Sequence, residues 1–293
     1  NIIRMSSRST MQSDLILDVF AQTLSAFPSI AAGTAVVTYT YDHAVTAEIS
    51  ASSDVRVIWG GDFTVNSVRQ APLPPHGRDL TFPDRFSMAA IGIDAYSQLA
   101  PDERLALAEA FFNDAYWFDQ LGCSSPRLVL WIGSGEAAKA SGDFFERVRV
   151  VSTRKGYAPE AATAIGKLAQ SMRTMIDGEV HHLTWLNNAV TLLDLADFAD
   201  VRGEFCGAGL FYQLALTSLH DLAPHVRRAD QTLSVFGISR AEIDTFVAEV
   251  RGRGIDRIVP IGQALSFDRV WDGMDLLQEF TRRVSVTLGA SAR

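Results

Sequence analysis

Cys123 stands in the sequence context best suited to nucleophilic chemistry. It follows an aromatic-rich helical run that ends at Gly122, and it precedes Ser124, Ser125 and Pro126 at the start of an apolar strand. This order predicts a turn that exposes the thiol, with the backbone amides of Cys123 and Ser124 facing outward together. A thiol reacts as its thiolate, and its usual pKa of about 8.5 falls where amides or cations surround it. The same two amides could stabilise an oxyanion formed by attack on a carbonyl.

The alternative for either cysteine is a buried, inert side chain, because a free cysteine usually packs as a small hydrophobe. Cys206, between Phe205 and Gly207 in an apolar stretch, is given that interpretation. The two cysteines lie far apart in differing contexts, which predicts reduced thiols rather than a disulfide framework. No metal site is predicted, because no metal-ligand motif occurs and the adjacent His181 and His182 cannot share one face of a helix or strand.

Alternating strands and helices must position the predicted turn at Cys123. In the first part of the chain, apolar spacing and β-branched runs predict helices at residues 14–26, 42–50 and 63–70 and strands at residues 35–41 and 55–59. A helix is predicted to begin at Pro101 and to run toward Cys123, and a strand is predicted over residues 127–132. This alternation is typical of parallel βαβ units, so the predicted fold class is α/β.

The rest of the chain continues the alternation. The sequence predicts strands at residues 86–93, 232–236 and 257–262 and helices at residues 136–148, 159–176 and 239–252. Two segments are left open: the one that begins at His181, and residues 276–288, which suit either a helix or a strand.

Two loops in the first third of the chain have possible functional meaning. Gly60 and Gly61 end a predicted strand, where backbone can approach a ligand and the next helix offers its amides to an anion. As a phosphate motif this turn is weak, and a plain connection with Asp62 as the helix N-cap explains it equally well. Prolines and glycines predict an irregular connection over residues 71–84, the clearest domain boundary. The charges in this region (Arg78, Asp79, Asp84 and Arg85) are predicted to be solvated or mutually satisfied.

Composition excludes several classes of partner. The 26 Lys and Arg against 34 Asp and Glu give a formal net charge of −8, and no basic block is present, which argues against nucleic acid. No apolar run reaches the roughly 20 residues that span a bilayer, and the N-terminus lacks the apolar region of a signal peptide. The sequence therefore predicts a cytoplasmic protein without a membrane span.

The segment from Phe118 to Pro126, with the sequence FDQLGCSSP, resembles the active-site segment of LuxC-type acyl-CoA reductases. These are the fatty-acid reductases of bacterial bioluminescence and their relatives in the aldehyde dehydrogenase superfamily. Further segments fit in the same order: NIIRMSSR at residues 1–8, VIWGGD at 57–62, FPDRFS at 82–87, DRIVPIG at 256–262 and WDG at 271–273. The resemblance covers nearly the whole chain, which is similar to the C-terminal two-thirds of such an enzyme.

The resemblance implies an aldehyde dehydrogenase-like architecture. Residues 1–80 would be part of a Rossmann-type dinucleotide-binding domain, residues 81–265 an α/β catalytic domain, and residues 266–293 a C-terminal return or oligomerisation segment. Gly60 and Gly61 would lie near the dinucleotide, and Arg4 and Ser6 would match the position near the adenosine ribose and its phosphate. The implied partners are acyl-CoA or an acyl-protein as substrate, an acyl-activating synthetase and further copies of the chain.

The implied reaction is reduction of a long-chain fatty acyl thioester to the aldehyde. Cys123 would become acylated, and hydride from NADPH, or alternatively NADH, would reduce the enzyme thioester. Oxidising relatives carry a glutamate base ahead of the cysteine, whereas residues 82–93 contain Asp84 and no glutamate, which suits a reductase that must exclude water. Two alternatives stay open: a cysteine acyltransferase or thioesterase that needs no nicotinamide, and a noncatalytic binding subunit.

Overall fold

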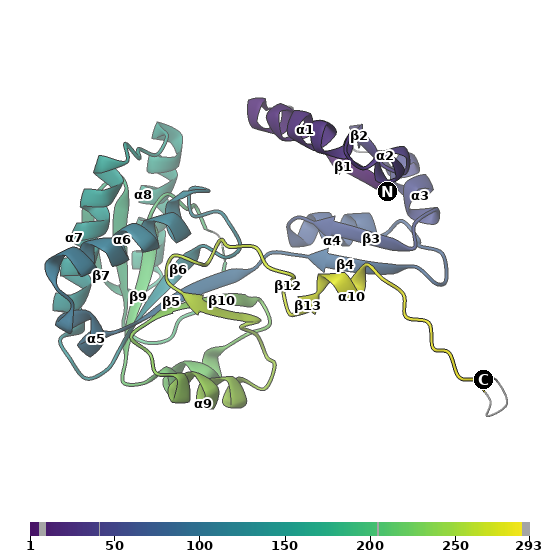
Figure 1. The fold of residues 1–293 in the computed structure, drawn as a ribbon. Helices are drawn as coiled ribbons and strands as arrows, with labels where there is room; N and C mark the ends of the chain where they lie inside the picture. Colours follow the sequence, from purple (N-terminus) through teal and green to yellow (C-terminus); the bar gives the residue numbers. More distant parts are fainter. Residues whose placement is uncertain (6–9, 41, 204, 289–293) are drawn as a thin grey trace. The chain divides into compact units, whose positions relative to one another are not determined.

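The computed structural model describes residues 1–5, 10–40, 42–203 and 205–288 (Figure 1). The chain divides into two compact units, residues 1–83 and 84–293. Both units alternate strands and helices, and the main sheet is largely parallel, so the predicted α/β class is confirmed. Among the described helices, none is both long and apolar enough to cross a membrane.

The smaller unit contains two separate pairs of parallel strands, β1 with β2 and β3 with β4. Its elements in chain order are β1 (Ile2–Met5), α1 (Met11–Leu24), α2 (Pro28–Ala32), β2 (Ala35–Thr38), α3 (His43–Ala51), β3 (Val55–Trp59), α4 (Asp62–Arg69) and β4 (Arg78–Phe82). Thr10 and Asp42 start α1 and α3 by accepting hydrogen bonds from amides of the first turn, the usual role of such residues at helix N-termini.

Two predictions in the smaller unit are wrong in detail. The irregular connection expected over residues 71–84 ends in β4, because Leu80 and Phe82 are buried and the ring of Phe82 stacks on Trp59 at 4.5 Å. The prolines before this strand masked its short alternating pattern. The N-cap of α4 is Gly61, and Asp62 is the first residue of the helix.

The larger unit is built on a seven-stranded sheet in the order β11-β10-β5-β6-β9-β8-β7, in which only the β7–β8 pair is antiparallel. Its strands are β5 (Phe86–Gly92), β6 (Pro126–Ile132), β7 (Val180–Asn187), β8 (Val190–Leu195), β9 (Leu210–Leu216), β10 (Asp230–Phe236), β11 (Arg257–Pro260), β12 (Val270–Trp271) and β13 (Met274–Asp275). Its helices are α5 (Ile93–Gln98), α6 (Pro101–Tyr116), α7 (Ala137–Arg154), α8 (Ala161–Ile176), the 3₁₀ helix η1 (Leu219–His225), α9 (Arg240–Val250) and α10 (Leu276–Glu279).

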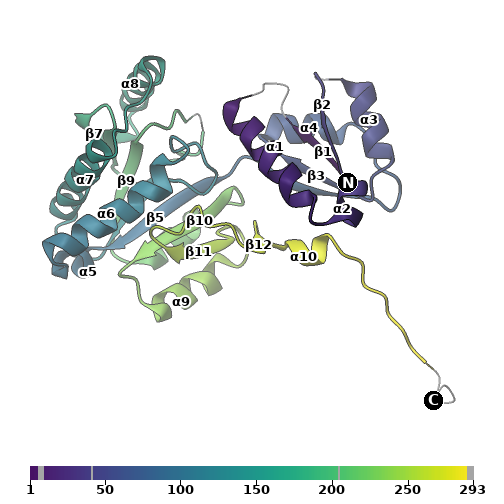
Figure 2. The ribbon, with the colours of Figure 1, turned by 45° about the horizontal axis from the view of Figure 1, so that its top comes forward.

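Two apolar cores lie on the two faces of this sheet. Along β5, Ala89 and Ile91 face the core shared with α5, α6 and α7, whereas Met88 and Ala90 face the core shared with α9 and η1. Figures 1 and 2 show α6 and α7 on one side of the sheet and α9 on the other. Strands buried on both faces read as continuous apolar runs, which is why β5 and β6 were predictable from the sequence.

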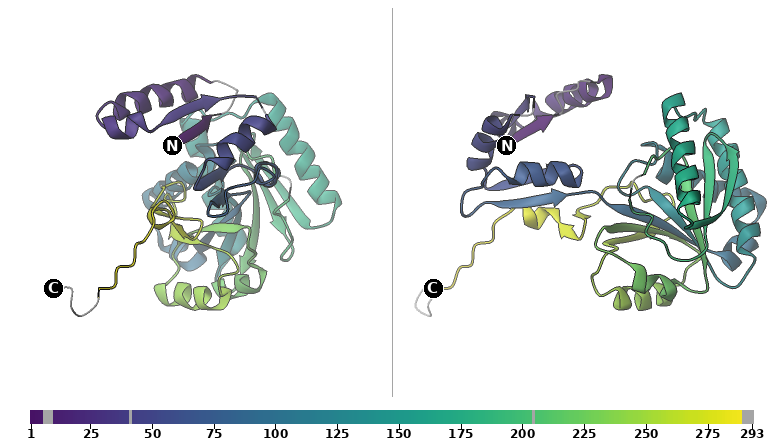
Figure 3. Two further views of the ribbon diagram at one scale, coloured as in Figure 1. Left: turned by 90° about the vertical axis from the view of Figure 1, so that its right-hand side faces the viewer. Right: turned by 180° about the vertical axis from the view of Figure 1, so that it is seen from behind.

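Several segments differ from the sequence-based expectation. The open segment after His181 forms the β7–β8 hairpin, and β9 was not predicted at all. Residues 276–288 form only the four-residue α10, followed by an irregular stretch that Figure 3 shows running away from the helix. The helices and strands predicted over residues 101–176 and 232–262 are confirmed, but the helix predicted to end at residue 148 continues to Arg154 as α7.

Candidate active site

Cys123 lies in a tight turn between α6 and β6, at the amino end of β6. The turn, residues 122–125, is called below the cysteine turn. It is closed by a hydrogen bond from the Ser125 amide to the Gly122 carbonyl, at 3.0 Å. Within the described part of the chain, the amides of Cys123 and Ser124 donate no hydrogen bond. Both amides are therefore available to an oxyanion. The thiol is half-buried, so the prediction that this turn leaves it exposed is wrong.

Ser87 fixes the backbone of the nucleophile. Its hydroxyl donates to the Cys123 carbonyl at 2.6 Å and accepts from the Thr232 amide at 3.2 Å. Ser87 is fully buried at the start of β5, so this hydroxyl links the cysteine turn to β5 and β10. Because the strands are parallel, the amino ends of β5, β6 and β10 meet at one edge of the sheet, where the turn lies.

Gln120 stabilises the backbone just before the cysteine turn. Its side-chain amide is fully buried, donates to the carbonyls of Pro126 and Leu210 at 3.0 and 2.9 Å, and accepts from the Gly209 amide at 2.9 Å. Asp119 and Gln120 both have left-handed backbones, with φ of 50° and 62°. Such φ values are unfavourable for these residues, so the three side-chain hydrogen bonds must stabilise the conformation.

Replacing Gln120 with leucine is expected to lower the free energy of unfolding by about 1–3 kcal/mol, because it leaves buried backbone groups without partners. The measurement is urea unfolding followed by tryptophan fluorescence. Gln98→Leu, at an exposed position on α5, serves as the control and should stay close to the parent protein. Equal stability of the two variants would contradict the role given to Gln120.

The charges around Cys123 do not favour its thiolate. Burial is the main cause that raises the pKa of the Cys123 thiol, and the carboxylates of Asp272 and Asp84 raise it further. The guanidinium groups of Arg127 and Arg85 act in the opposite direction. The pKa of the Cys123 thiol is therefore raised above its usual value, because burial and the two carboxylates outweigh the cations.

Arg85 is buried and paired rather than solvated. Its guanidinium forms an ion pair with Asp256, lies 3.4 Å from the Asp272 carboxylate, and donates to the backbone carbonyls of Ala229 and Asp230. Gln231 donates a further hydrogen bond to Asp272. This set, called below the Arg85 network, brings the WDG turn to the amino ends of β5 and β10.

The charges of Arg78, Asp79, Asp84 and Arg85 were predicted to be solvated or to satisfy one another. This prediction is wrong for Arg85, which pairs with Asp256 and Asp272. Asp79 also has a partner outside that cluster, Arg56 on β3, with Nε and Oδ1 2.7 Å apart. The four charges are close in sequence, but Asp79 and Arg85 belong to different units of the chain.

The predicted cofactor residues lie in the smaller unit. Gly60 and Gly61 connect β3 to α4, and no side chain caps the first amides of α4. A Cβ added at Gly60 would come within 3.1 Å of Thr64 Cγ2, so the glycine keeps this turn open. Arg4 on β1 donates to the Tyr39 carbonyl at 3.3 Å, and its guanidinium lies 4.6 Å from the centre of the Tyr39 ring. Ser6 lies outside the described residues.

The structure brings together some of the predicted site residues and not others. Cys123 and Ser124 share one turn of the larger unit. Arg4 and the Gly60–Gly61 turn stand on different strand pairs of the smaller unit, and no described hydrogen bond joins them.

Ser87, Gln120, Arg127 and Asp272 were not singled out as site residues from the sequence. Ser87, Gln120 and Asp272 lie in segments that carry the family resemblance, and that was the available signal. The contacts of Gln120 and Arg127 depend on β9 and the loop before it, which the sequence did not predict.

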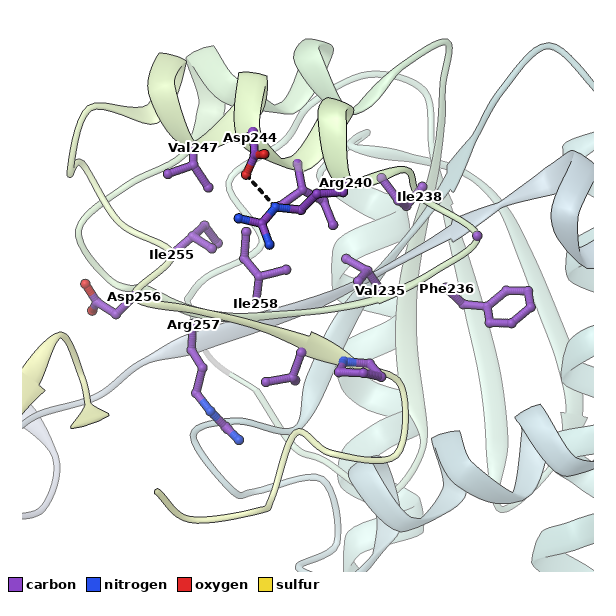
Figure 4. Close-up of a pocket in the computed structure, with 14 residues that line it drawn as sticks. Val235, Phe236, Ile238, Arg240, Asp244, Val247, Ile255, Asp256, Arg257 and Ile258 are labelled. Atoms are coloured by element: carbon purple, nitrogen blue, oxygen red, sulfur yellow. Dashed lines mark hydrogen bonds and ion pairs between the residues drawn. The ribbon is translucent and has the colours of Figure 1, made fainter. Parts of the chain in front are cut away.

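An open groove of about 670 Å³ lies between α9 and the edge strand β11 (Figure 4). Its lining is mainly apolar and includes Val247, Ile255 and Ile258; Figure 4 shows Ile258 directed toward α9 and Arg257 directed away from it. No residue of the cysteine turn lines this groove. It is the open edge of the second core, and it is distinct from the site of the thiol.

Solved structures with the same fold are aldehyde dehydrogenases. The chain is similar to an NAD-dependent aldehyde dehydrogenase from Sinorhizobium meliloti, with a TM-score of 0.54 and 14% identity over 78% of this chain and 47% of that one. A 1-pyrroline-5-carboxylate dehydrogenase from Thermus thermophilus gives 0.56 and 13%, covering 81% and 49%. An indole-3-acetaldehyde dehydrogenase from P. syringae, solved with NAD+ and IAA, gives 0.55 and 12%, covering 81% and 50%. The chain thus has an aldehyde dehydrogenase fold and spans about half the length of these structures.

The family is defined more narrowly by sequence. Residues 1–193 match the model of the acyl-CoA reductase (LuxC) family, and the chain belongs to that family. A comparison with curated proteins found no match. The matched residues include the Gly60–Gly61 turn and the whole cysteine turn, so the resemblance based on FDQLGCSSP is confirmed at the level of the family.

Proposed function

We propose that this chain carries the nucleophile of an NADPH-dependent reductase that converts a long-chain fatty acyl thioester to the aldehyde. The observation that carries the proposal is the cysteine turn: in a chain of the acyl-CoA reductase family, Cys123 stands beside two backbone amides that have no described partner. A thiol and two free donors are what an acyl-transfer step to the enzyme requires.

The acylation step follows from this geometry. The Cys123 thiolate attacks the carbonyl carbon of the acyl thioester, and the amides of Cys123 and Ser124 hold the resulting oxyanion. Collapse of that intermediate breaks the bond to the carrier sulfur, which takes up a proton and leaves as a free thiol. Ser87 holds the Cys123 carbonyl throughout, so that the amides stay directed at the reacting oxygen. The acyl group is then a thioester of Cys123.

The reduction step returns the thiol to its starting form. NADPH, when bound, supplies the hydride that converts the Cys123 thioester to a thiohemiacetal. The thiohemiacetal oxyanion lies on the same two amides. Its collapse breaks the carbon–sulfur bond, releases the aldehyde and leaves the Cys123 thiolate. Water must be kept from the acyl-enzyme, and the half-burial of Cys123 together with the buried Ser124 and Ser125 limits its access.

The residues of the smaller unit fit part of a dinucleotide. The Gly60–Gly61 turn has no side chain to block close approach, and the uncapped amides of α4 can donate to a pyrophosphate. Asp62 adds a carboxylate to this turn, so backbone donors rather than net positive charge would carry the binding. Arg4, exposed on β1, could pair with a phosphate on the adenosine ribose, which favours NADPH over NADH. Ser6 is proposed beside it from the resemblance alone.

Replacing Gly60 with valine is expected to weaken NADPH binding about tenfold or more, since a Cβ at this position already crowds Thr64 and a loss of 1.4 kcal/mol corresponds to tenfold. The Kd for NADPH, measured by protein fluorescence quenching, is the readout. Gly33→Ala, where a Cβ meets only ordinary contacts, is the matched control. Acylation of Cys123 should be the same in both variants. Unchanged NADPH affinity in Gly60→Val would remove this turn from the cofactor site.

Three further points are proposed from the family alone: the acyl group arrives on CoA or on a protein, an acyl-activating synthetase is a partner, and the chain forms homo-oligomers. The test of the reaction is NADPH oxidation by the purified protein in the presence of a long-chain acyl-CoA, with the aldehyde identified as product. Release of the free acid at a rate independent of NADPH would instead assign a thioesterase. Failure of Cys123 to acylate would assign a noncatalytic subunit.

A further inference from the structure

The helix α8 turns its apolar side to solvent. Four large apolar residues recur at every third or fourth position and are between 43% and 84% exposed: Ile165, Leu168, Met172 and Ile176. The buried residues of the same helix are all polar: Lys167, Ser171 and Thr174. A surface helix normally packs its apolar stripe on the core and leaves its polar face in water, so α8 is oriented the opposite way.

Polar contacts hold α8 in this orientation. The Lys167 ammonium donates to the carbonyls of Asn188 and Ala208, at 2.6 and 2.9 Å. The Thr174 hydroxyl lies 3.5 Å from the hydroxyl of Tyr212 on β9. A rotation of the helix that buried the apolar stripe would break these hydrogen bonds, and a buried ammonium requires such partners. The stripe therefore faces outward as long as Lys167 is buried.

Among the residues that the structure describes, none covers this stripe. The helix packs chiefly on β7, the last strand of the sheet, and Figure 2 shows it at the periphery of the larger unit. On its outer side, a Cβ added at Gly166 would meet nothing within 4 Å. A contiguous apolar surface of this kind is typical of an interaction site.

The residues of the stripe complement those of a second copy in the antiparallel orientation. A two-fold axis through the middle of α8 sets Ile165 of one copy opposite Met172 of the other. The same axis sets the exposed Ala161 opposite Ile176, so that a small residue faces a large one at each end. A parallel pair would set each residue opposite itself, with a gap at Ala161 and two large side chains at Ile176. Close packing therefore favours the antiparallel pair, as do the helix dipoles.

A lipid surface fits this stripe less well than a second copy. Helices that lie in a membrane interface carry Lys and Arg on the face opposite their apolar stripe. In α8 that face is buried, and its cation, Lys167, is bonded to carbonyls of the protein. The formal net charge of −8 also opposes binding to anionic headgroups.

We propose that α8 is a dimerisation surface, on which α8 of a second copy packs antiparallel and covers the stripe. The homo-oligomers proposed above from the family have no assigned surface, and this inference supplies one. It rests on the proposed function for the homo-oligomeric state alone and does not depend on the reaction of Cys123.

The test is the molar mass of the purified protein, measured by light scattering during gel filtration. The parent protein is expected to contain at least two copies of the 32.0 kDa chain. Ile165→Arg and Met172→Glu are each expected to halve the molar mass, because each places an unpaired charge in the apolar contact. Circular dichroism checks that the variants fold, which these exposed positions should allow.

A double variant tests the antiparallel arrangement. Ile165→Arg combined with Met172→Glu is expected to restore the parent molar mass, because an antiparallel pair sets a guanidinium opposite a carboxylate at both ends. A parallel pair would set like charges opposite each other. A double variant that keeps the halved molar mass would therefore overturn the antiparallel arrangement.

Val247→Arg is the matched control. Val247 is an exposed apolar residue of α9 that lines the open groove, and its replacement should leave the molar mass unchanged. A parent protein of a single chain, or an unchanged molar mass in Ile165→Arg, would overturn the proposal. So would a halved molar mass in Val247→Arg alone, which would move the contact to the groove. Cosedimentation of a single-chain parent protein with phosphatidylcholine vesicles, lost in Ile165→Arg, would assign the stripe to lipid instead.

This experiment is separable from the test of function. If acyl-CoA is not reduced but Ile165→Arg halves the molar mass, the surface on α8 stands and the proposed reaction fails. If acyl-CoA is reduced and Ile165→Arg leaves the molar mass unchanged, the reaction stands and the surface on α8 fails.

Discussion

Replacing Cys123 with serine is expected to reduce NADPH-dependent aldehyde formation by roughly 10³-fold or more, the order of loss seen when a covalent nucleophile is removed. Serine is close in size, and the hydrogen bond from Ser87 goes to the backbone carbonyl of residue 123, so the turn should be retained. What is lost is ionisation, since a hydroxyl stays protonated at pH values where a thiol forms its thiolate. The measurement is NADPH oxidation together with aldehyde detection.

Cys206→Ser is the matched control for this prediction. Cys206 is also half-buried, burial raises the pKa of its thiol, and it lies in the loop before β9 rather than in the cysteine turn. Its replacement is expected to leave turnover close to that of the parent protein. Comparable turnover by Cys123→Ser and the parent, or a loss confined to Cys206→Ser, would mean that the nucleophile has been assigned to the wrong residue.

Replacing Arg85 with methionine is expected to lower the free energy of unfolding by about 3–5 kcal/mol, because it leaves the buried carboxylate of Asp272 without its cation and removes one of two cations from Asp256. Asp272 is buried, and among the residues that the structure describes Asp256 would retain the exposed Arg228 as its cation, at 3.0 Å. The two backbone carbonyls that accept from Arg85 would also lose a donor. Urea unfolding followed by tryptophan fluorescence measures the effect, and four of the five tryptophans lie in the larger unit.

The same substitution should also slow the chemistry of Cys123. Arg85 lowers the pKa of the thiol, so its loss leaves Asp272 and Asp84 to raise that pKa further and reduces the thiolate fraction at neutral pH. Arg240→Met, an exposed arginine paired with Asp244 on α9, is the control and is expected to change stability by less than about 1 kcal/mol. Similar unfolding curves for the two variants would show that the Arg85 network does not stabilise the unit.

The cysteine turn could be located from the sequence because its signals are local. The helix that begins at Pro101, the glycine at position 122 and the proline at the start of β6 mark a break between two regular elements. What the sequence could not give is the environment of the thiol. The positions of Asp272 and Arg85 depend on pairing between residues more than 140 positions apart, and local patterns carry no information on such contacts.

The errors in the predicted fold have a similar cause. β4 was hidden by the prolines that precede it, and its burial comes from packing on β3. Apolar and polar residues alternate imperfectly in the β7–β8 hairpin and in β9, because β8 and β9 are buried on both faces. The spacing of apolar residues alone therefore could not distinguish a helix from a strand in these segments. The two buried residues that lock the cysteine turn to β9, Gln120 and Gly209, were missed together with that strand.

The proposed reaction depends most directly on an acyl group that is bound to Cys123 before it is reduced. The decisive measurement incubates the purified protein with a long-chain acyl-CoA in the absence of NADPH and locates the added acyl mass by peptide mass spectrometry. The predicted result is a stable acyl group on the peptide that contains Cys123, which disappears as the aldehyde is released when NADPH is added. An acyl group on another residue, or one that is lost as the free acid whether or not NADPH is present, would contradict the account.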